Sequence, residues 1–243
     1  MSPTTAPAQS PLQPQFATVE DAVITSVDWL VEPCWKGDRL LVRFDDGNVQ
    51  LTDQHGINRS RDLHEAAEVL AESIDADQAL IDGIWTAMPF IGQGSSARQW
   101  AQTVAEETGA EEQPDPATLE TRRAFVAWDL VELDGQPLHD IPYQERRRLL
   151  SSVIIENIRV RVSPAVRIPV HGYLVAWKAN GFTHFVAKQV NSRYRHGETT
   201  DSWLQVNVDP EKQPSMVGRL FGQRPRKLRH LRDAPGQEDP HRR

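Results

Sequence analysis

Residues 32–39 read EPCWKGDR and bring a carboxylate, a thiol, an amine and a guanidinium close together in the chain. A thiolate and a neutral lysine amine are both nucleophiles that can attack phosphorus. Each needs help, because a free thiol has a pKa of about 8.5 and a free lysine one of about 10.4. Cys34 and Lys36 are two residues apart, so on an extended strand they would share a face. The stretch therefore raises the question of a working, a disabled or an absent nucleophilic site.

Bulk composition narrows the classes of protein. The 243 residues carry a formal net charge of −7, which argues against coating nucleic acid by overall charge but allows a local basic groove. The single cysteine excludes an internal disulfide and a cysteine-rich zinc site, and the histidine spacing indicates no metal cage. No apolar run approaches the roughly 20 residues that span a bilayer. We expect a cytoplasmic protein with no membrane contact and no metal ligands.

The order of elements predicts an α+β fold of two mainly antiparallel sheets with flanking helices. Residues 1–16 should be a disordered leader, 17–208 one domain and 209–243 a basic, flexible tail. Helices are expected at 60–74, with Ser60 as N-cap, and at 96–107, 142–154 and 172–182, and residues 17–29 should be partly helical. Strands are expected at 78–89, 159–168, 183–190 and 202–208. Residues 40–54 and 122–138 should form hairpins, and the strand at 78–89 should turn at Asp82-Gly83.

Four stretches, in order, resemble motifs of ATP-dependent DNA ligases of the bacterial end-joining type. EPCWKGDR resembles EPKWDGxR, and ALIDGIW lies where those enzymes have LDGE. AFVAWDLVELDGQPLHDIPYQERRRLL is similar to FxxFDLLYLDGxDLxxxPLxxRRxxL. GFTHFVAKQVNSRYRHGETTDSWLQVN is similar to LEGVVAKRxxSxYxPGxRSxxWLKxK. Together they cover about residues 20–207.

The resemblance implies the adenylation-domain fold shared by DNA ligases and mRNA capping enzymes, which is ATP-grasp-like and holds ATP between its sheets. It implies a lysine that attacks the α-phosphate, Mg²⁺ if the chain is active, and DNA as the partner. Active family members carry a following OB-fold domain. About 36 residues follow Asn207 here, so we expect no OB-fold domain in this sequence.

The sequence departs from the family pattern where the chemistry is expected. Cys34 stands at the nucleophile position, and Lys36 replaces the aspartate two residues on. Polar or apolar side chains stand where the pattern has a glutamate, a lysine or a phosphate-contacting arginine: Gln54, Ile84, Thr183, Gln205 and Asn207. This pattern is typical of a framework that is kept around a lost reactive centre.

The resemblance also suggests which residues still touch nucleotide. These predicted nucleotide-binding residues are Glu32, Cys34, Arg39, Trp128 and Lys188. Each has a structural alternative: Trp128 as core, Arg39 as the partner of a carboxylate, and Cys34 as a small buried residue. In the tail, four cations are candidate nucleic-acid contacts, namely Arg224, Arg226, Lys227 and Arg229.

Three functions follow as hypotheses. The first is a catalytically degenerate ligase-like domain that binds nucleotide or DNA, or scaffolds a protein partner, in DNA repair. The second is an active nucleotidyltransferase in which Lys36 or Lys188 replaces the lost nucleophile. The third is a protein-interaction module that no longer binds nucleic acid.

Overall fold

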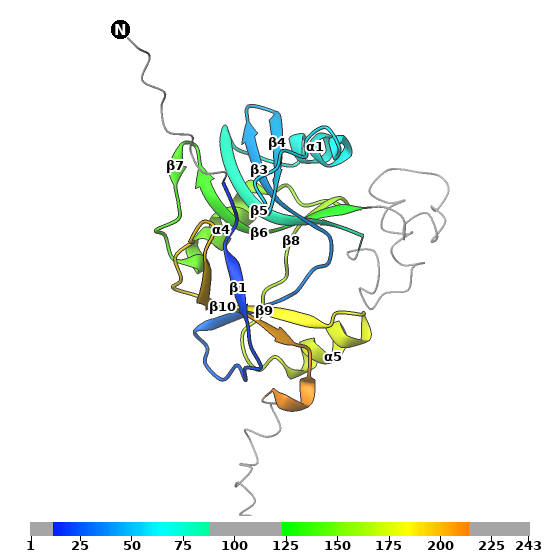
Figure 1. Cartoon of the computed structure of the whole chain (residues 1–243), viewed down its shortest axis with the longest axis vertical. Helices are drawn as coiled ribbons and strands as arrows, with labels where there is room; N and C mark the ends of the chain where they lie inside the picture. Colours follow the sequence, from blue (N-terminus) through cyan, green and yellow to red (C-terminus); the bar gives the residue numbers. More distant parts are fainter. Residues whose placement is uncertain (1–11, 88–122, 214–243) are drawn as a thin grey trace, which may run out of the picture.

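Two β-sheets form the body of the molecule, and the computed structural model describes residues 12–87 and 123–213. The larger sheet runs β4-β3-β5-β6-β7, with β8 parallel to β6. The smaller runs β1-β10-β9-β2, with β1 parallel to β10. All other pairs are antiparallel. Figure 1 shows the larger sheet above the smaller one. The predicted fold of two mainly antiparallel sheets is confirmed.

The strands are bounded as follows: β1 Phe16–Val19, β2 Trp29–Pro33, β3 Asp38–Asp45, β4 Asn48–Asp53, β5 Gln78–Thr86, β6 Ala124–Leu133, β7 Gln136–Pro137, β8 Val160–Val162, β9 His184–Gln189 and β10 Thr199–Asn207. The helices are α1 His64–Ala71, α4 Tyr143–Val153, α5 His171–Ala179 and the short 3₁₀ turn η2 Pro210–Lys212. The helix expected at 96–107 lies outside the described residues.

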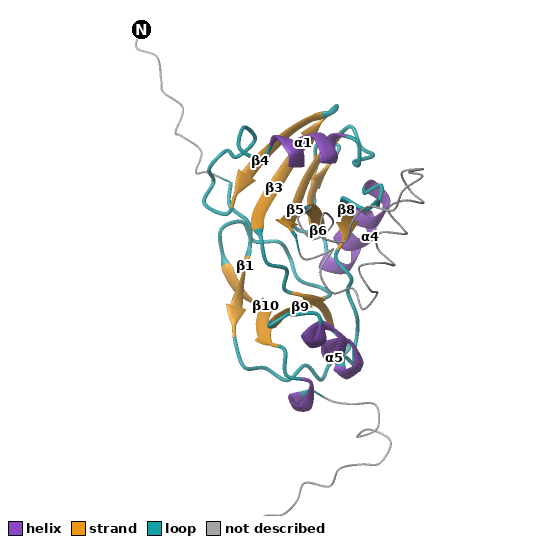
Figure 2. Ribbon diagram, turned by 90° about the vertical axis from the view of Figure 1, so that its right-hand side faces the viewer, coloured by secondary structure: helices purple, strands orange, loops and turns teal. Residues whose placement is uncertain are grey.

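Helices cover the outer faces of the sheets, as Figure 2 shows in a side view. One core joins the larger sheet to α1 and α4 through residues such as Leu40, Leu70 and Leu150. A second joins the smaller sheet to α5 and reaches β6 at Trp128. Burial of these apolar side chains supplies most of the stabilisation, at about 25 cal/mol per Å². Side chains of both sheets therefore border the space between them.

The β3–β4 hairpin forms because its two-residue turn suits the twist of its strands. Asp46 and Gly47 have φ angles of 43° and 83°, the left-handed backbone of a tight hairpin turn. The β6–β7 hairpin turns in the same way at Asp134 and Gly135, with φ of 47° and 73°. Both hairpins were predicted from their Asp-Gly pairs, and both are confirmed.

The turn predicted at Asp82-Gly83 is wrong, because both residues lie in the middle of β5. A bulge in the β5–β6 pairing falls between them. Glycine is needed there for space: a Cβ on Gly83 would lie 2.3 Å from the Phe125 ring and 2.6 Å from the Val126 carbonyl oxygen. An Asp-Gly pair is typical of a hairpin turn, but here it lies inside a buried strand.

Two helix predictions are wrong, one for its whole segment and one at its N-terminal end. Residues 17–29 contain no helix, and β1 occupies their start because it pairs with β10, about 180 residues away. Ser60 is not an N-cap: its hydroxyl accepts a hydrogen bond from the Leu51 amide at 2.9 Å, and α1 begins later, at His64. Pairing with another segment decided both cases, with β10 for residues 16–19 and with Leu51 in β4 for Ser60.

The packed region extends beyond the predicted domain limits at both ends. Gln15 is fully buried, and its amide group donates to the Thr200 hydroxyl at 2.8 Å. Gln213 is also buried, where it accepts from the Ile24 amide at 2.9 Å. Gln15 and Gln213 therefore pack against the body of the domain, and the domain limits themselves stay a prediction. Within the described ranges, no helix has the length and apolar character to cross a membrane.

Candidate functional site

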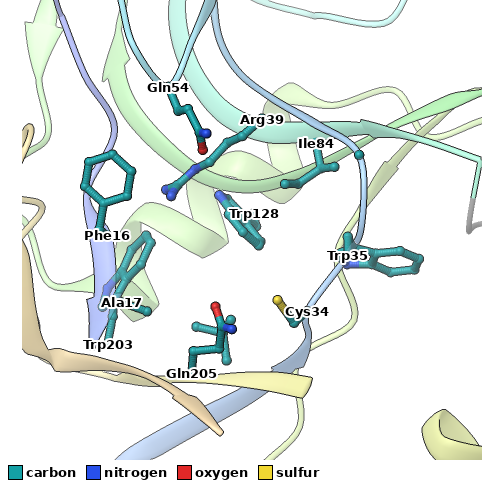
Figure 3. A pocket seen from close by; sticks show the side chains of 12 residues that line it. Phe16, Ala17, Cys34, Trp35, Arg39, Gln54, Ile84, Trp128, Trp203 and Gln205 are labelled. Atoms are coloured by element: carbon teal, nitrogen blue, oxygen red, sulfur yellow. The ribbon is translucent and has the colours of Figure 1, made fainter. Parts of the chain in front are cut away.

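A pocket of about 260 Å³ lies between the two sheets. Strands of both sheets contribute to it, together with the segment that leads from β2 to β3 (Figure 3). Its lining residues are Phe16, Ala17, Cys34, Trp35, Gly37, Arg39, Gln54, Ile84, Trp128, Val186, Trp203 and Gln205. Three of the five predicted nucleotide-binding residues, Cys34, Arg39 and Trp128, line this one pocket.

Cys34 follows β2 directly and places its sulfur at the pocket wall (Figure 3). The side chain is half-buried. Burial raises the pKa of the Cys34 thiol, and the positive charges of Arg39 and Lys36 only partly oppose the shift. The thiol is therefore protonated at neutral pH. Lys36 itself is exposed and is not among the residues that line the pocket.

Arg39 enters the pocket from β3 but is bound to a carboxylate. Its Nε and a terminal nitrogen donate to the two carboxylate oxygens of Asp82 at 3.1 and 2.7 Å. The same terminal nitrogen donates to the Gln15 carbonyl oxygen at 2.6 Å. Burial alone would lower the pKa of Arg39, but the Asp82 carboxylate raises it, so the guanidinium stays charged. Arg39 thus pairs with a nearby carboxylate, and its contact with nucleotide stays a prediction.

Trp128 and Trp203 form an aromatic corner of the pocket. Their rings meet nearly edge to face, with centroids 6.5 Å apart and an interplanar angle of 78°. The guanidinium carbon of Arg39 lies 4.9 Å from the centroid of the Trp128 ring, within the range of a cation–π contact. The predicted aromatic face is thus present at the pocket wall.

Glu32 and Lys188 do not line the pocket but are buried behind the aromatic corner. The Lys188 amine lies 3.2 Å from a Glu32 carboxylate oxygen and donates to the Trp128 carbonyl oxygen at 3.1 Å. Tyr143 donates its hydroxyl hydrogen to the same Glu32 oxygen. The amine is also 4.2 Å from the centroid of the Trp203 ring. Burial lowers the pKa of Lys188, and the Glu32 carboxylate opposes that shift.

Three further positions where the sequence departs from the family pattern line the pocket, namely Gln54, Ile84 and Gln205. The other two do not: Thr183 pairs with the neighbouring His184 ring at 2.9 Å, and Asn207 ends β10. Arg224, Arg226, Lys227 and Arg229 lie outside the described residues.

Sequence reasoning missed the part that the N-terminal strand plays. Phe16 and Ala17 line the pocket, and the Phe16 ring lies 5.6 Å from the guanidinium carbon of Arg39. It also missed Tyr194, whose hydroxyl donates to Asp82 at 2.7 Å. Phe16, near which the structured region was expected to begin, was the one local indication of this strand. The contacts themselves join residues far apart in sequence, so local patterns cannot reveal them.

Comparisons with known proteins bear on these features. A family model described as the ATP-dependent DNA ligase domain matches residues 12–206. The multifunctional non-homologous end joining DNA repair protein LigD of Mycobacterium tuberculosis is 28% identical over 197 residues, which are 80% of this chain and 24% of that protein. A DNA ligase of Thermococcus onnurineus is 24% identical over 214 residues, 84% of this chain and 37% of the ligase. The chain thus spans well under half the length of these relatives.

Solved structures agree in fold. A mycobacterial DNA ligase D complexed with ATP and MES superposes with a TM-score of 0.58 at 24% identity, covering 81% of this chain and 60% of that one. The ligase domain of M. tuberculosis LigD gives a TM-score of 0.55 at 25% identity, covering 80% and 58%. With most of its length matched by the family model, the chain belongs to the family of ATP-dependent DNA ligase domains.

Proposed function

We propose that this chain is a catalytically degenerate ligase domain that forms no covalent adenylate and serves as a binding or scaffolding module at DNA ends or nicks. One observation carries the proposal: four departures from the family's catalytic pattern meet in a single pocket, at Cys34, Gln54, Ile84 and Gln205. All four stand where the family resemblance places the chemistry.

The nucleophile position does not suit attack on a phosphate. A cysteine side chain is several atoms shorter than a lysine side chain, so its sulfur would stand farther from a phosphorus placed for lysine. Attack also needs the thiolate. Because burial raises the pKa of the Cys34 thiol, the protonated form dominates at neutral pH. Both distance and protonation state therefore oppose adenylation of Cys34.

The pocket does not fit the triphosphate of ATP. Arg39 is the one lysine or arginine among the residues that line the pocket, and its positive charge is paired with the Asp82 carboxylate. Gln54 and Gln205 offer neutral amides where the family pattern has cations. A transition state that develops charge on phosphate oxygens needs fixed positive groups around it. The lining supports binding without that chemistry.

Mg²⁺ fits no better. The Asp82 carboxylate already accepts hydrogen bonds from Arg39 and Tyr194. Glu32 is bound to Tyr143 and Lys188 behind the pocket. Within residues 12–87 and 123–213, no group of three or more His, Cys, Asp or Glu side chains is arranged to hold a metal ion.

The competing hypothesis of an active transferase has one observation in its favour. The pKa of Lys188 is lowered, and a nucleophilic lysine must be neutral. Yet the Lys188 side chain is fully buried and held by Glu32 and the Trp128 carbonyl group, away from the pocket lining. Lys36 is exposed but does not line the pocket either. Reaction of either lysine would require the site to rearrange.

Nick joining tests the catalytic half of the proposal. Purified protein is incubated with a nicked duplex, ATP and Mg²⁺ or Mn²⁺, with the ligase domain of M. tuberculosis LigD as the positive control. The proposal predicts no joined product at any ratio of protein to DNA. Joining by the wild type that disappears in Lys36→Ala or Lys188→Ala would establish the active transferase instead.

Binding to DNA tests the other half. Duplexes with a nick, with a free end and without either are titrated at low salt, where contacts with phosphates are strongest. The proposal predicts measurable binding that favours the nick or the end. Failure to bind any of these duplexes would favour a module that recognises only protein.

A further inference from the structure

β1 is an open edge of the smaller sheet. The strand order β1-β10-β9-β2 gives β1 one neighbour, β10, within the part of the chain that the structure describes (Figure 2). The strand at the other edge, β2, is bridged to Val166. Phe16 and Glu20 donate their amides on the β10 side, so the alternation of the strand turns the backbone groups of Ala17 and Val19 outward. Outward backbone groups of this kind are a template for a further strand.

Apolar side chains are exposed along this edge and just after it. Val19 is 74% exposed, and Val23 and Val27 are about half exposed. Exposed valines beside an unpaired strand edge favour contact with a partner segment. Phe16 and Ala17, at the other end of the strand, line the pocket. A segment paired with β1 would therefore lie beside the pocket.

The last described residue lies next to this edge. Gln213 accepts a hydrogen bond from the Ile24 amide at 2.9 Å and donates one to the Ala22 carbonyl oxygen at 3.0 Å. Lys212 forms an ion pair with Asp21 at 2.8 Å. The segment that follows Gln213 therefore starts beside the residues that follow β1. Seven extended residues span about 23 Å, more than the roughly 13 Å of a four-residue strand, so this segment can run back along the whole of β1.

The sequence after Gln213 suits an edge strand. Residues 214–221 read PSMVGRLF, with large apolar side chains at Met216, Val217, Leu220 and Phe221. Valine and phenylalanine favour strands. The proline stands where such a strand would begin, which is a position that tolerates proline.

Charge favours this segment over other occupants of the edge. Glu20, Glu198 and Asp201 lie on or next to β1 and β10 and are exposed. Residues 214–232 hold six lysines and arginines and no aspartate or glutamate, whereas residues 1–11 have no charged side chain. The β1 strand of a second copy would bring the same carboxylates, which repel one another. The basic segment is therefore the complementary partner.

We propose that residues 215–221 add to β1 as an outer, antiparallel strand of the smaller sheet. The added strand pairs with the outward backbone groups of Ala17 and Val19, as in recognition by strand addition, and covers the Val19 side chain. Its direction carries the basic residues that follow Phe221 toward the Phe16 end of β1, beside the pocket. The contact goes beyond the proposed function and holds whether or not the pocket can adenylate.

The anchor at Gln213 also predicts the register of the added strand. Val19 lies three to five residues before Ala22 and Ile24, which bind the Gln213 side chain. Its partner should lie a similar distance after Gln213, at residues 216–218. Cross-strand Cα atoms are about 4.5–5.5 Å apart, which is within the range that a disulfide needs.

Disulfide trapping in the full chain tests this pairing. In a Cys34→Ser background, Val19→Cys is combined in turn with a cysteine at position 216, 217 or 218. The control is Val175→Cys with Val217→Cys, since Val175 is an exposed valine of α5, away from β1. At least one Val19 combination should form an intramolecular disulfide about tenfold or more faster than the control, because the paired cysteines are held at bonding distance. Equal rates would overturn the proposal. Disulfides between two copies would assign the edge to a second copy and overturn it as well.

Amide hydrogen exchange provides a second measurement without a cross-link. Val217→Pro with Gly218→Pro removes two successive amides, one of which must face β1 in either register. Gly236→Pro with Gln237→Pro is the control, since it adds two prolines to the same tail outside the proposed strand. The first variant should speed exchange of the two outward amides of β1 about tenfold or more, and the control should leave it unchanged. Protection that survives the first variant would place another segment on the edge and overturn the proposal. Outward amides that are unprotected in the wild type would overturn it too.

Discussion

Arg39 on β3 and Asp82 on β5 form a two-point ion pair in the wall of the pocket, with hydrogen bonds of 3.1 and 2.7 Å. The Asp82 side chain is fully buried, and that of Arg39 is 11% exposed. Both residues survive from the family's motifs, yet here each satisfies the other. The pair therefore links two neighbouring strands and matches the positive charge of Arg39 at the pocket wall.

Loss of one partner of the Arg39–Asp82 pair should destabilise the fold. Arg39→Met leaves the Asp82 carboxylate buried and unpaired, so we expect the free energy of unfolding to fall by about 3–5 kcal/mol. The double variant Arg39→Met with Asp82→Asn should lose less than Arg39→Met alone. Urea unfolding at neutral pH measures both. Arg43→Met is the control on the same strand. Arg43 forms a partly exposed ion pair with Glu132, so this change should lower the free energy of unfolding by about 0–1 kcal/mol.

The thiol of Cys34 should be slow to react at neutral pH. Burial raises its pKa above the ordinary value, so the thiolate fraction in the folded protein stays low until the solution is more alkaline than about pH 8.5. Because Cys34 is the chain's single cysteine, iodoacetamide labelling reports it alone. The labelling rate should have its midpoint above that of the same protein unfolded in urea. A midpoint at or below the unfolded value would show an activated thiol and contradict the account.

Lys188 should make stability depend on pH in the alkaline range. Its folded-state pKa is lowered, so between that value and about 10.4 the unfolded chain binds more protons than the folded chain. The free energy of unfolding contributed by Lys188 therefore rises with pH across that window. The raised pKa values of Tyr143 and Tyr194 act in the opposite direction above about pH 10, so the test is a difference. Subtracting the curve of Lys188→Met from that of the wild type should leave the rising component.

Gly83 should be intolerant of any side chain. A Cβ there would meet the Phe125 ring at 2.3 Å, so Gly83→Ala should lower the free energy of unfolding by about 1–3 kcal/mol through overpacking. Gly172→Ala is the matched control, because nothing lies within 4 Å of a Cβ at that position in α5. It should be neutral or stabilising by up to about 1 kcal/mol. Equal effects of the two changes in thermal unfolding would refute the close contact.

Local patterns predicted the elements that are closed by local contacts. The β3–β4 hairpin followed from Asp46-Gly47, and α4 followed from Pro142, which suits the first turn of a helix. The same patterns failed where a distant strand decides the structure. β1 forms because it pairs with β10, and position 83 needs glycine because the Phe125 ring lies against it. Local sequence can indicate neither contact.

The candidate site could be predicted in part, because the family resemblance indicates the fold. The motif order indicated a shared site for Cys34, Arg39 and Trp128, and all three line one pocket. That they contact nucleotide stays a prediction. Glu32 and Lys188 were expected to touch nucleotide, and that remains a prediction. Their pairing depends on β2 and β9 being neighbours, with Glu32 opposite Val186 in the register, and only the structure supplies that relationship.

Intact mass after incubation with ATP and Mg²⁺ or Mn²⁺ tests the central claim most directly. The wild type is measured beside the double variant Cys34→Lys with Lys36→Asp, which restores the residues that the family has at these two positions of the first motif. The account predicts no added AMP on the wild type and none on the double variant, because Gln54, Ile84 and Gln205 still line the pocket. A gain on the double variant alone would show that the pocket still accepts ATP and would contradict the proposed misfit between the pocket and the triphosphate. A gain of one AMP on the wild type would contradict the account as a whole.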